Sequence, residues 1–278
     1  MIMVIEMDFT DDEMKALARY QNIDYRVINS LLRHGYESEK TINERAGRDY
    51  PYLTRDMLNE YLFCIDQIYS VILKAYRYNN YLPPDKVTYR GTQKAILEAM
   101  NNDECSFLST STSHIQTRNF SVLYSKDGIK NDSERAIAIV EGNIPWIDLD
   151  EFMGGMEGEI IYVPAKVSVT PIDTNLDPKL GKTYKMTLSE LEIPEKTEEE
   201  IKGMRKTILD KTETMSDYLK LILEAQTNLS LQNTPQLAFA TKEYCNWKDL
   251  VVSYNHQQYR LLKNNIIEQN KVEEIKKY

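Results

Sequence analysis

The chain has 278 residues and a formal net charge of −9 at pH 7. Such an acidic balance disfavours a broad nucleic-acid-binding surface, and three widely spaced cysteines exclude a disulfide framework and a zinc site. No apolar run approaches the length of a membrane-spanning helix. We therefore expect a soluble protein made in a cytoplasm, with delivery into another cell by a specialised route left open, and no membrane span.

The first part of the chain reads as helical. Residues 8–35 begin with Thr10, a good helix cap, which three acids follow in the first turn. The pattern breaks near residues 21–22, and a second short helix closes at Gly35. Residues 36–52 read as a loop. A long helix with an apolar stripe follows from Thr54 or Asp56, and the paired Asn and Pro residues of 79–85 end it.

Short strands dominate the middle of the chain. The first strand covers residues 87–91 and carries Tyr89-Arg90-Gly91. A helix is expected over 92–102, and a buried strand over 105–111 carries Phe107-Leu108-Ser109-Thr110-Ser111. The further expected elements are a short helix over 117–124, a polar turn over 127–133, a strand over 135–140 and an acidic loop over 148–156.

A strand over residues 157–163 opens with Glu157-Gly158-Glu159, and another strand follows over 166–172. Side chains two positions apart on a strand face the same way, so both carboxylates are expected to point to one place. From residue 178 the composition changes. One helix is expected from about 197 to 228 and a further helical stretch over 244–278, both with apolar stripes.

The three strand motifs, in this order, resemble the Arg, Ser-Thr-Ser and Glu-x-Glu signature of the mono-ADP-ribosyltransferases, and most of all the exotoxin-type branch. Tyr20, Tyr25, Ile28-Asn29 and Leu32-Arg33 also resemble the front of those domains, although an ordinary amphipathic helix pair is an equally good interpretation. The resemblance covers residues 8–173. It implies an α+β fold, with a split mixed sheet around an NAD cleft, N-terminal helices packed against it and a C-terminal helical extension. We predict a transferase domain at residues 1–177 and the extension at 178–278.

The resemblance implies roles that the chemistry explains. Breaking the bond between nicotinamide and ribose leaves a ribose with oxocarbenium character, which a carboxylate stabilises; Glu159 is the candidate. Arg90 is the candidate to grip the NAD diphosphate with its guanidinium fork, and Ser109 to orient Glu159.

Further residues come from the same resemblance. Gly91 follows the Arg and would read the nicotinamide amide through its main chain, with Tyr25 and Thr110 as other NAD contacts. Phe152 is a candidate target contact, although packing back on its own domain is an equally good interpretation. His114 is interpreted as a solvent-facing or structural histidine rather than a base. Only 18 residues, 91–108, separate Arg90 from Ser109, a shorter connection than in many relatives.

The acceptor is predicted from Glu157. Two carboxylates in Glu-x-Glu resemble the arginine-modifying subgroup, where the first Glu engages the guanidinium, which must lose a proton to act as a nucleophile. Protein arginine is therefore the predicted acceptor, and an RNA or DNA base is the alternative. A third interpretation is a catalytically inert NAD-binding module. NAD is the predicted co-substrate, and no metal is predicted.

The C-terminal helices carry more apolar residues than a free tail needs. We expect them to be buried either as a buttress on the sheet or against a partner. The partner would be a neutralising protein or the target.

Overall fold

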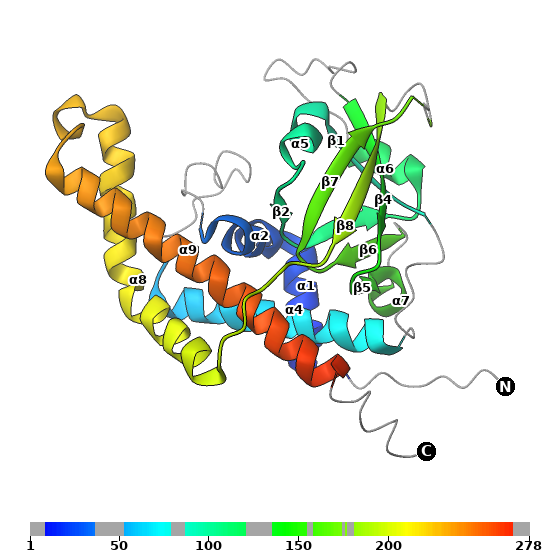
Figure 1. Cartoon of the computed structure of the whole chain (residues 1–278), viewed down its shortest axis with the longest axis horizontal. Coiled ribbons are helices and arrows are strands. Elements are labelled where there is room, and N and C mark those ends of the chain that lie inside the picture. The colour runs from blue at the N-terminus through cyan, green and yellow to red at the C-terminus, as the bar shows by residue number, and fades with distance from the viewer. Residues whose placement is uncertain are drawn as a thin grey trace. The chain divides into compact units, whose positions relative to one another are not determined.

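The computed structural model describes residues 9–36, 53–78, 87–120, 135–154, 158–173, 176 and 181–268. They form two compact units, which are described separately below. The sheet unit lies within residues 71–192. The helical unit combines residues from 9–70 with residues from 193 onward. The boundary falls inside one long helix, α4 (Arg55–Tyr78), between Ser70 and Val71 (Figure 1).

The sheet unit contains an eight-stranded mixed sheet in the order β2-β7-β8-β4-β1-β3-β6-β5. Strands β4 and β8 run parallel, and the other neighbours are antiparallel. The strands are β1 Thr88–Gln93, β2 Glu104–Cys105, β3 Leu108–Ser111, β4 Arg135–Gly142, β5 Trp146–Asp148, β6 Glu159–Tyr162, β7 Ala165–Pro171 and β8 Lys182–Ser189. The α+β class with a mixed sheet is as predicted.

Strands β1 and β3 pair along the shortest stretch of any two neighbouring strands in this sheet. Strand β1 pairs with β4 along six residues, from Thr88 to Gln93. With β3 its recorded register is the single pair Tyr89–Ser111, whereas β3 pairs with β6 along four residues. One part of the sheet, β2-β7-β8-β4-β1, therefore meets the other part, β3-β6-β5, at one residue pair. Hydrogen bonds from side chains add further links between the two parts.

Three short helices complete the sheet unit. They are α5 (Lys94–Ala99), α6 (His114–Phe120) and α7 (Leu149–Met153). Helix α7 is bounded by good terminators. The Asp148 carboxylate accepts from the amides of Asp150 and Glu151 at its start, and Gly154 ends it with φ +72°.

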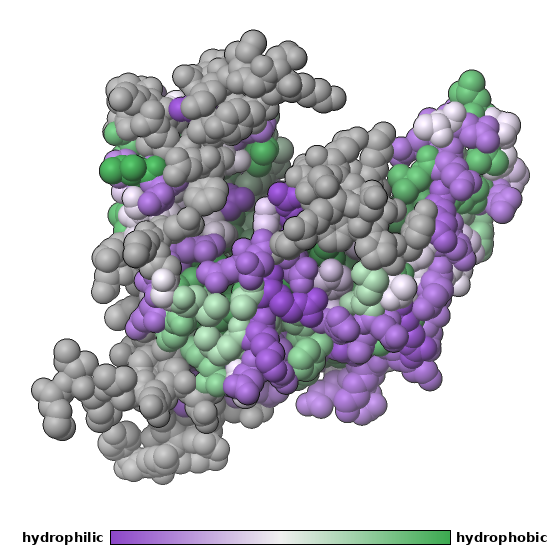
Figure 2. All heavy atoms as spheres, turned by 180° about the vertical axis from the view of Figure 1, so that it is seen from behind, coloured by the Kyte–Doolittle hydropathy of each residue, from purple (hydrophilic) through white to green (hydrophobic). Residues whose placement is uncertain are grey.

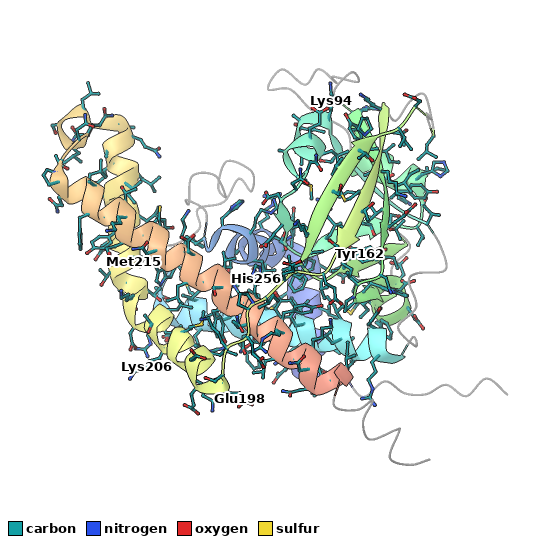
Figure 3. The ribbon with its side chains drawn as sticks, viewed as in Figure 1. Lys94, Tyr162, Glu198, Lys206, Met215 and His256 are labelled. Carbon is teal, nitrogen blue, oxygen red and sulfur yellow. The ribbon has the colours of Figure 1, made fainter. Side chains whose placement is uncertain are left out.

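The core of the sheet unit is apolar, with a few buried hydroxyls that are bonded. Residues of β4, β6 and β8 such as Ile137, Ile161 and Met186 are buried. Tyr162 of β6 (Figure 3) lies 3.1 Å, oxygen to oxygen, from the Thr88 hydroxyl. Burial raises the pKa of Tyr162, and the Thr88 contact opposes this effect. The Tyr162 hydroxyl therefore stays protonated and joins β6 to β1.

Two helices of the helical unit begin with a capping box. Thr10 pairs reciprocally with Glu13 at the start of α1, and Thr197 does so with Glu200 at the start of α8. The unit contains α1 Asp11–Arg19, η1 Tyr20–Asp24, α2 Tyr25–His34, most of α4, α8 Glu198–Thr227, η3 Leu229–Leu231, α9 Pro235–Lys263 and η4 Asn264–Glu268. Gly35 ends α2 with φ +71°. A Cβ there would overlap the Lys248 main chain of α9.

The apolar stripes of α8 and α9 are buried within the helical unit. Ile208, Met215 and Leu219 of α8 are buried, and Figure 3 labels Met215 where the two helices pack. Trp247 of α9 is 3% exposed, and its Nε1 donates to the Ile208 carbonyl at 3.2 Å. Helix α9 also packs against the N-terminal helix α2. The C-terminal helices thus share a core with N-terminal ones.

A partly buried polar cluster lies in the same unit. Arg205 of α8 donates to Asp66 of α4 at 3.3 Å, to the Tyr254 hydroxyl at 2.6 Å and to the Asn59 side chain at 2.9 Å. Gln258 adds a second bond to Asp66 at 3.2 Å. Burial raises the pKa of Asp66 to about 6, although Arg205 opposes this effect.

At its free end, the hairpin of α8 and α9 exposes apolar side chains, seen as green atoms in Figure 2. Leu229 is 80% exposed and Phe239 57%. No described helix is both long enough and apolar enough to cross a bilayer.

Several predicted boundaries were wrong. The region 92–102 is divided between the end of β1 and α5, and the strand over 105–111 is interrupted, so that β2 joins β7 and β3 joins β6. Helix α6 begins at His114 rather than residue 117. The region 148–156 was interpreted as a loop but contains α7. The predicted loop at 36–52 and turn at 127–133 lie outside the described residues, apart from Tyr36.

Strand β8 was missed entirely. It lies beyond residue 177, where an extension of helices was predicted, and it pairs with both β4 and β7. The compact units are also grouped differently from the predicted division, since α1 and α2 belong with α8 and α9. The division into a transferase domain at 1–177 and an extension at 178–278 stays a prediction about function.

Candidate active site

Arg90 ties the two parts of the sheet together. It lies on β1, next to the single residue pair that joins β1 to β3. Its Nη1 donates to the main-chain oxygen of Ser109 at 2.7 Å. The guanidinium therefore supplies a link between β1 and β3 where the main-chain ladder does not continue. Arg90 is half-buried, and the Nε atom of its guanidinium is buried.

Ser109 and Glu159 form the shortest polar contact of this region. The Ser109 Oγ donates to the Glu159 Oε1 at 2.5 Å, from the middle of β3 to the first residue of β6. Hydrogen bonds to a charged acceptor are shorter and stronger than neutral ones. The antiparallel register sets Ser111, not Ser109, directly opposite Glu159, so the bond runs diagonally across the strand pair. Both side chains are half-buried.

The main chain just before Glu159 is held from two directions. The amide of Gly158 donates to the Asp150 Oδ2 at 2.6 Å, and the carbonyl of Gly158 accepts from the Thr112 amide at 2.8 Å. The amide of Glu159 itself donates to the Asp150 Oδ1 at 3.4 Å. Gly158 has φ +61°, and a Cβ there would lie 2.1 Å from the Thr112 hydroxyl. Only glycine fits this position.

Gly91 is needed because of a neighbouring helix. A Cβ on Gly91 would lie 1.9 Å from the Thr117 carbonyl oxygen, which belongs to α6. The close approach that its small size permits, within the described residues, is therefore that of the α6 main chain. The predicted contact between the Gly91 main chain and nicotinamide stays a prediction.

The other predicted site residues are distributed as follows. Thr110 is 4% exposed, and its hydroxyl donates to the Ile160 carbonyl at 3.1 Å, so its side chain joins β3 to β6. Phe152 is half-buried on α7. Tyr25 is 37% exposed on α2 of the helical unit, where its hydroxyl accepts from Arg26 Nε at 3.0 Å. Glu157 lies outside the described residues. The structure thus brings together Arg90, Ser109 and Glu159.

His114 belongs to the margin of this site. It is exposed at the start of α6, and its ring meets that of Tyr89 edge to face, with centroids 5.8 Å apart. This packing agrees with the interpretation of His114 as a solvent-facing or structural residue. In the described parts of the chain, no three His, Cys, Asp or Glu side chains are grouped so that they could hold a metal ion.

Asp150, Thr112 and Gly158 are the site residues that sequence reasoning missed. A signal for Asp150 was present, because Asp148 is a good N-cap and Gly154 a good C-terminal glycine. Together they predict a short helix with Asp150 in its first turn. The contact between that helix and Gly158 depends on the path of residues that separate them and has no local signal.

Comparison with known proteins gives structural matches. No protein-family model matches the chain, and no curated protein does either. The matching solved structures include several ADP-ribosyltransferases.

One is the ADP-ribosyltransferase Vis in complex with agmatine, 19% identical, covering 68% of this chain and 80% of Vis, with a TM-score of 0.42. Another is exoenzyme S from Pseudomonas aeruginosa bound to Carba-NAD, 17% identical over 69% and 82% of the two chains, with a TM-score of 0.37. A third is the ADP-ribosylating toxin BECa of C. perfringens with NADH, 15% identical over 66% and 44%, with a TM-score of 0.37.

Proposed function

We propose that this protein is an NAD-dependent mono-ADP-ribosyltransferase of the toxin or effector type, which transfers ADP-ribose to protein arginine. The observation that carries the proposal is the 2.5 Å bond between Ser109 Oγ and Glu159 Oε1, with the Arg90 guanidinium bonded to the main chain of the same Ser109. Three residues from three strands, each predicted from a separate motif, are brought into one bonded group.

The role proposed for Glu159 follows from the charge that the reaction develops. When the C1′–N bond of NAD breaks, its electron pair leaves with the nicotinamide nitrogen and the ribose gains oxocarbenium character. A carboxylate fixed beside C1′ stabilises that positive charge. A fixed carboxylate does this better than a mobile one, because no reorganisation is needed during the reaction. The Ser109 bond fixes one oxygen of Glu159.

Arg90 is proposed to bind the diphosphate of NAD. A guanidinium can bond a phosphate with two parallel N–H groups. The bond from its Nη1 to Ser109 sets the plane of that group and limits its rotamers. Binding NAD would then cost less side-chain entropy than with a free arginine.

The transfer step balances without a metal or a redox partner. An arginine guanidinium attacks C1′, the C–N bond to ADP-ribose forms, and nicotinamide leaves as a neutral molecule. The guanidinium gives up one proton, and Glu157 is the proposed acceptor. With water in place of arginine the same site hydrolyses NAD to ADP-ribose and nicotinamide.

The first experiment measures release of nicotinamide from NAD by the pure full chain. We expect slow hydrolysis by the wild type and a loss of at least about a hundredfold in Glu159→Gln, which keeps the shape of the side chain but removes its charge. Glu151→Gln is the matched control, since Glu151 is exposed on α7. Binding of NAD without any release would instead indicate an inert NAD-binding module.

The second experiment identifies the acceptor. Labelled NAD is mixed with a cell lysate and the enzyme, and the product is treated with protease or with nuclease. Label lost with protease supports a protein acceptor, and label lost with nuclease supports an RNA or DNA base. Glu157→Gln is expected to reduce transfer to arginine far more than hydrolysis. Equal losses would contradict the role given to Glu157.

A further inference from the structure

We infer that Asp150 is a positioning residue for the proposed reaction, which fixes the main chain at Gly158 and thereby aims the Glu159 carboxylate. This inference rests on the proposed function. It concerns a residue that the three motifs do not contain, on the short helix α7 rather than on a strand.

Asp150 binds the main chain on the N-terminal side of Glu159 with both of its oxygens. Oδ2 accepts from the Gly158 amide at 2.6 Å, and Oδ1 lies 3.4 Å from the Glu159 amide, which donates to it. A charged acceptor strengthens such bonds to main-chain amides. The first contact is the short one, so Gly158 is the principal point of attachment.

The helix that carries Asp150 is itself anchored. Asp148 accepts from the amides of Asp150 and Glu151, and Gly154 closes the single turn in the left-handed conformation. Asp148 is also the last residue of β5, which pairs with Ile160 of β6. The route from β6 through β5 and α7 back to Gly158 is therefore a closed loop of hydrogen bonds.

The opposite side of Gly158 is held as well. Its carbonyl accepts from the Thr112 amide at 2.8 Å, and the Thr112 hydroxyl occupies the space that a Cβ would need. A peptide fixed at both its amide and its carbonyl cannot rotate without breaking a bond. The backbone direction with which the chain enters Glu159 is thereby set.

Glu159 is held at two separate points, one on its main chain and one on its side chain. Its main chain is held through Gly158 and Asp150, and its carboxylate through Ser109. A displacement of about 1 Å in a group that acts on a transition state can cost on the order of a hundredfold in rate. Loss of the Asp150 contacts should therefore reduce kcat while leaving the affinity for NAD nearly unchanged.

The test compares Asp150→Asn, Asp150→Ala and the charge control Glu151→Gln in the full chain. Asn keeps one acceptor oxygen for Gly158 but turns an amide toward the Glu159 N–H, and Ala removes both acceptors. We expect kcat for NAD hydrolysis to fall about tenfold in the Asn variant and about fiftyfold in the Ala variant. Calorimetric NAD binding should keep its stoichiometry and its Kd within about twofold.

A second readout does not depend on activity. With 15N-glycine labelling, the ten glycines give a simple amide spectrum in which Gly158 can be followed. We expect hydrogen exchange at Gly158 to become at least about tenfold faster in Asp150→Ala and to stay unchanged in Glu151→Gln.

The outcomes are separable. If the wild type is active and the kcat of Asp150→Ala lies within twofold of the wild-type value, the inference is overturned. It is also overturned if the stoichiometry of NAD binding falls in parallel with kcat, because the variant would then be partly unfolded. Unchanged exchange at Gly158 overturns it as well. Wild type that neither binds nor hydrolyses NAD defeats the proposed function instead, and the exchange result then still decides whether Asp150 holds Gly158.

Discussion

One set of polar contacts in the sheet unit and the polar cluster around Arg205 in the helical unit are built in different ways. In the sheet unit, the side chains of Arg90, Thr110 and Asp150 bond to main-chain groups of neighbouring strands and turns. In the helical unit, Arg205 and Asp66 bond to each other and to further side chains inside a helical core. The first kind of contact fixes the backbone, and the second fills space between helices.

This difference bears on where chemistry can be placed. A side chain that bonds to the main chain of a strand has a position set by the sheet register, which leaves little freedom. The sheet unit therefore suits a site that needs carboxylate and guanidinium groups held in fixed positions. The helical unit buries the apolar stripes of its long helices, and burial raises the pKa of Asp66 in its polar cluster.

The largest effect is expected in the helical core. Trp247→Ala removes a side chain that is 3% exposed, stacks on Tyr244 and donates to the Ile208 carbonyl. We expect the free energy of unfolding to fall by about 4 kcal/mol. Urea unfolding followed by helical circular dichroism measures it. Asn246→Ala, an exposed neighbour, should change it by less than about 0.5 kcal/mol.

In the sheet unit, the expected large effect comes from main-chain crowding. Gly91→Ala drives a Cβ against the Thr117 carbonyl and should cost about 3 kcal/mol of unfolding free energy. The control is Gly203→Ala on α8, where no atom lies within 4 Å. There we expect a gain of about 0.5 kcal/mol, because alanine favours the helix. If Gly91→Ala leaves the free energy of unfolding in urea unchanged, the close approach of α6 to Gly91 is contradicted.

The helical unit should also carry a specific pH dependence. Burial raises the pKa of Asp66 to about 6, so the native state binds its proton more tightly than the unfolded chain does. The contribution of Asp66 to stability is therefore complete below about pH 4 and is lost as the pH rises to 6, by up to about 3 kcal/mol.

Urea unfolding at pH 4 and pH 7 measures this effect. The comparison variant is Asp66→Asn, which does not titrate. The difference in unfolding free energy between the two pH values should shift by up to about 3 kcal/mol between wild type and variant. An identical difference in both proteins would show that Asp66 keeps an ordinary pKa.

The smallest effect expected is on rate rather than stability. Ser109→Ala removes the bond to Glu159 and should lower kcat for NAD hydrolysis about thirtyfold, or about 2 kcal/mol. The unfolding free energy should change by less than about 1 kcal/mol, because Ser109 is half-buried. Combined with Asp150→Ala, the loss should be smaller than the product of the single losses if both act on Glu159. If the loss in kcat of the double variant equals the product of the two single losses, Ser109 and Asp150 act independently of each other.

The strands and their motifs were predictable for a physical reason. Arg90, Ser109 and Glu159 each lie on a short strand that the local pattern predicted, although the ends of the first two strands were placed wrongly. What joined them was the resemblance, because pairing of β1, β3 and β6 is not local. Thr110 alternates with Ser109 and so faces the core, which the period of a strand could have indicated.

The missed elements depended on distant contacts. Strand β8 alternates buried Tyr184 and Met186 with exposed Lys185, a readable strand pattern that was overlooked beside the change of composition. A truncation after Asp173 would remove β8 from between β4 and β7 together with the C-terminal helices. The union of α2 with α9 has no local signal, since it joins residues far apart in the chain.

The helical unit combines residues that precede the sheet unit in the sequence with residues that follow it, so its parts are synthesised at different times. The described residues of the sheet unit lie within one stretch of the chain, 71–192, which leaves the ribosome before α9 is made. Helix α2 packs against α9 and must wait for it, and at about 5–20 residues per second the delay is on the order of 10–50 s. The face that α2 packs against α9 is uncovered for that time.

We expect nascent chains stalled before α9 to expose α2 to protease and to bind holdase chaperones, and the released chain to do neither. Equal protection of stalled and released chains would contradict this order.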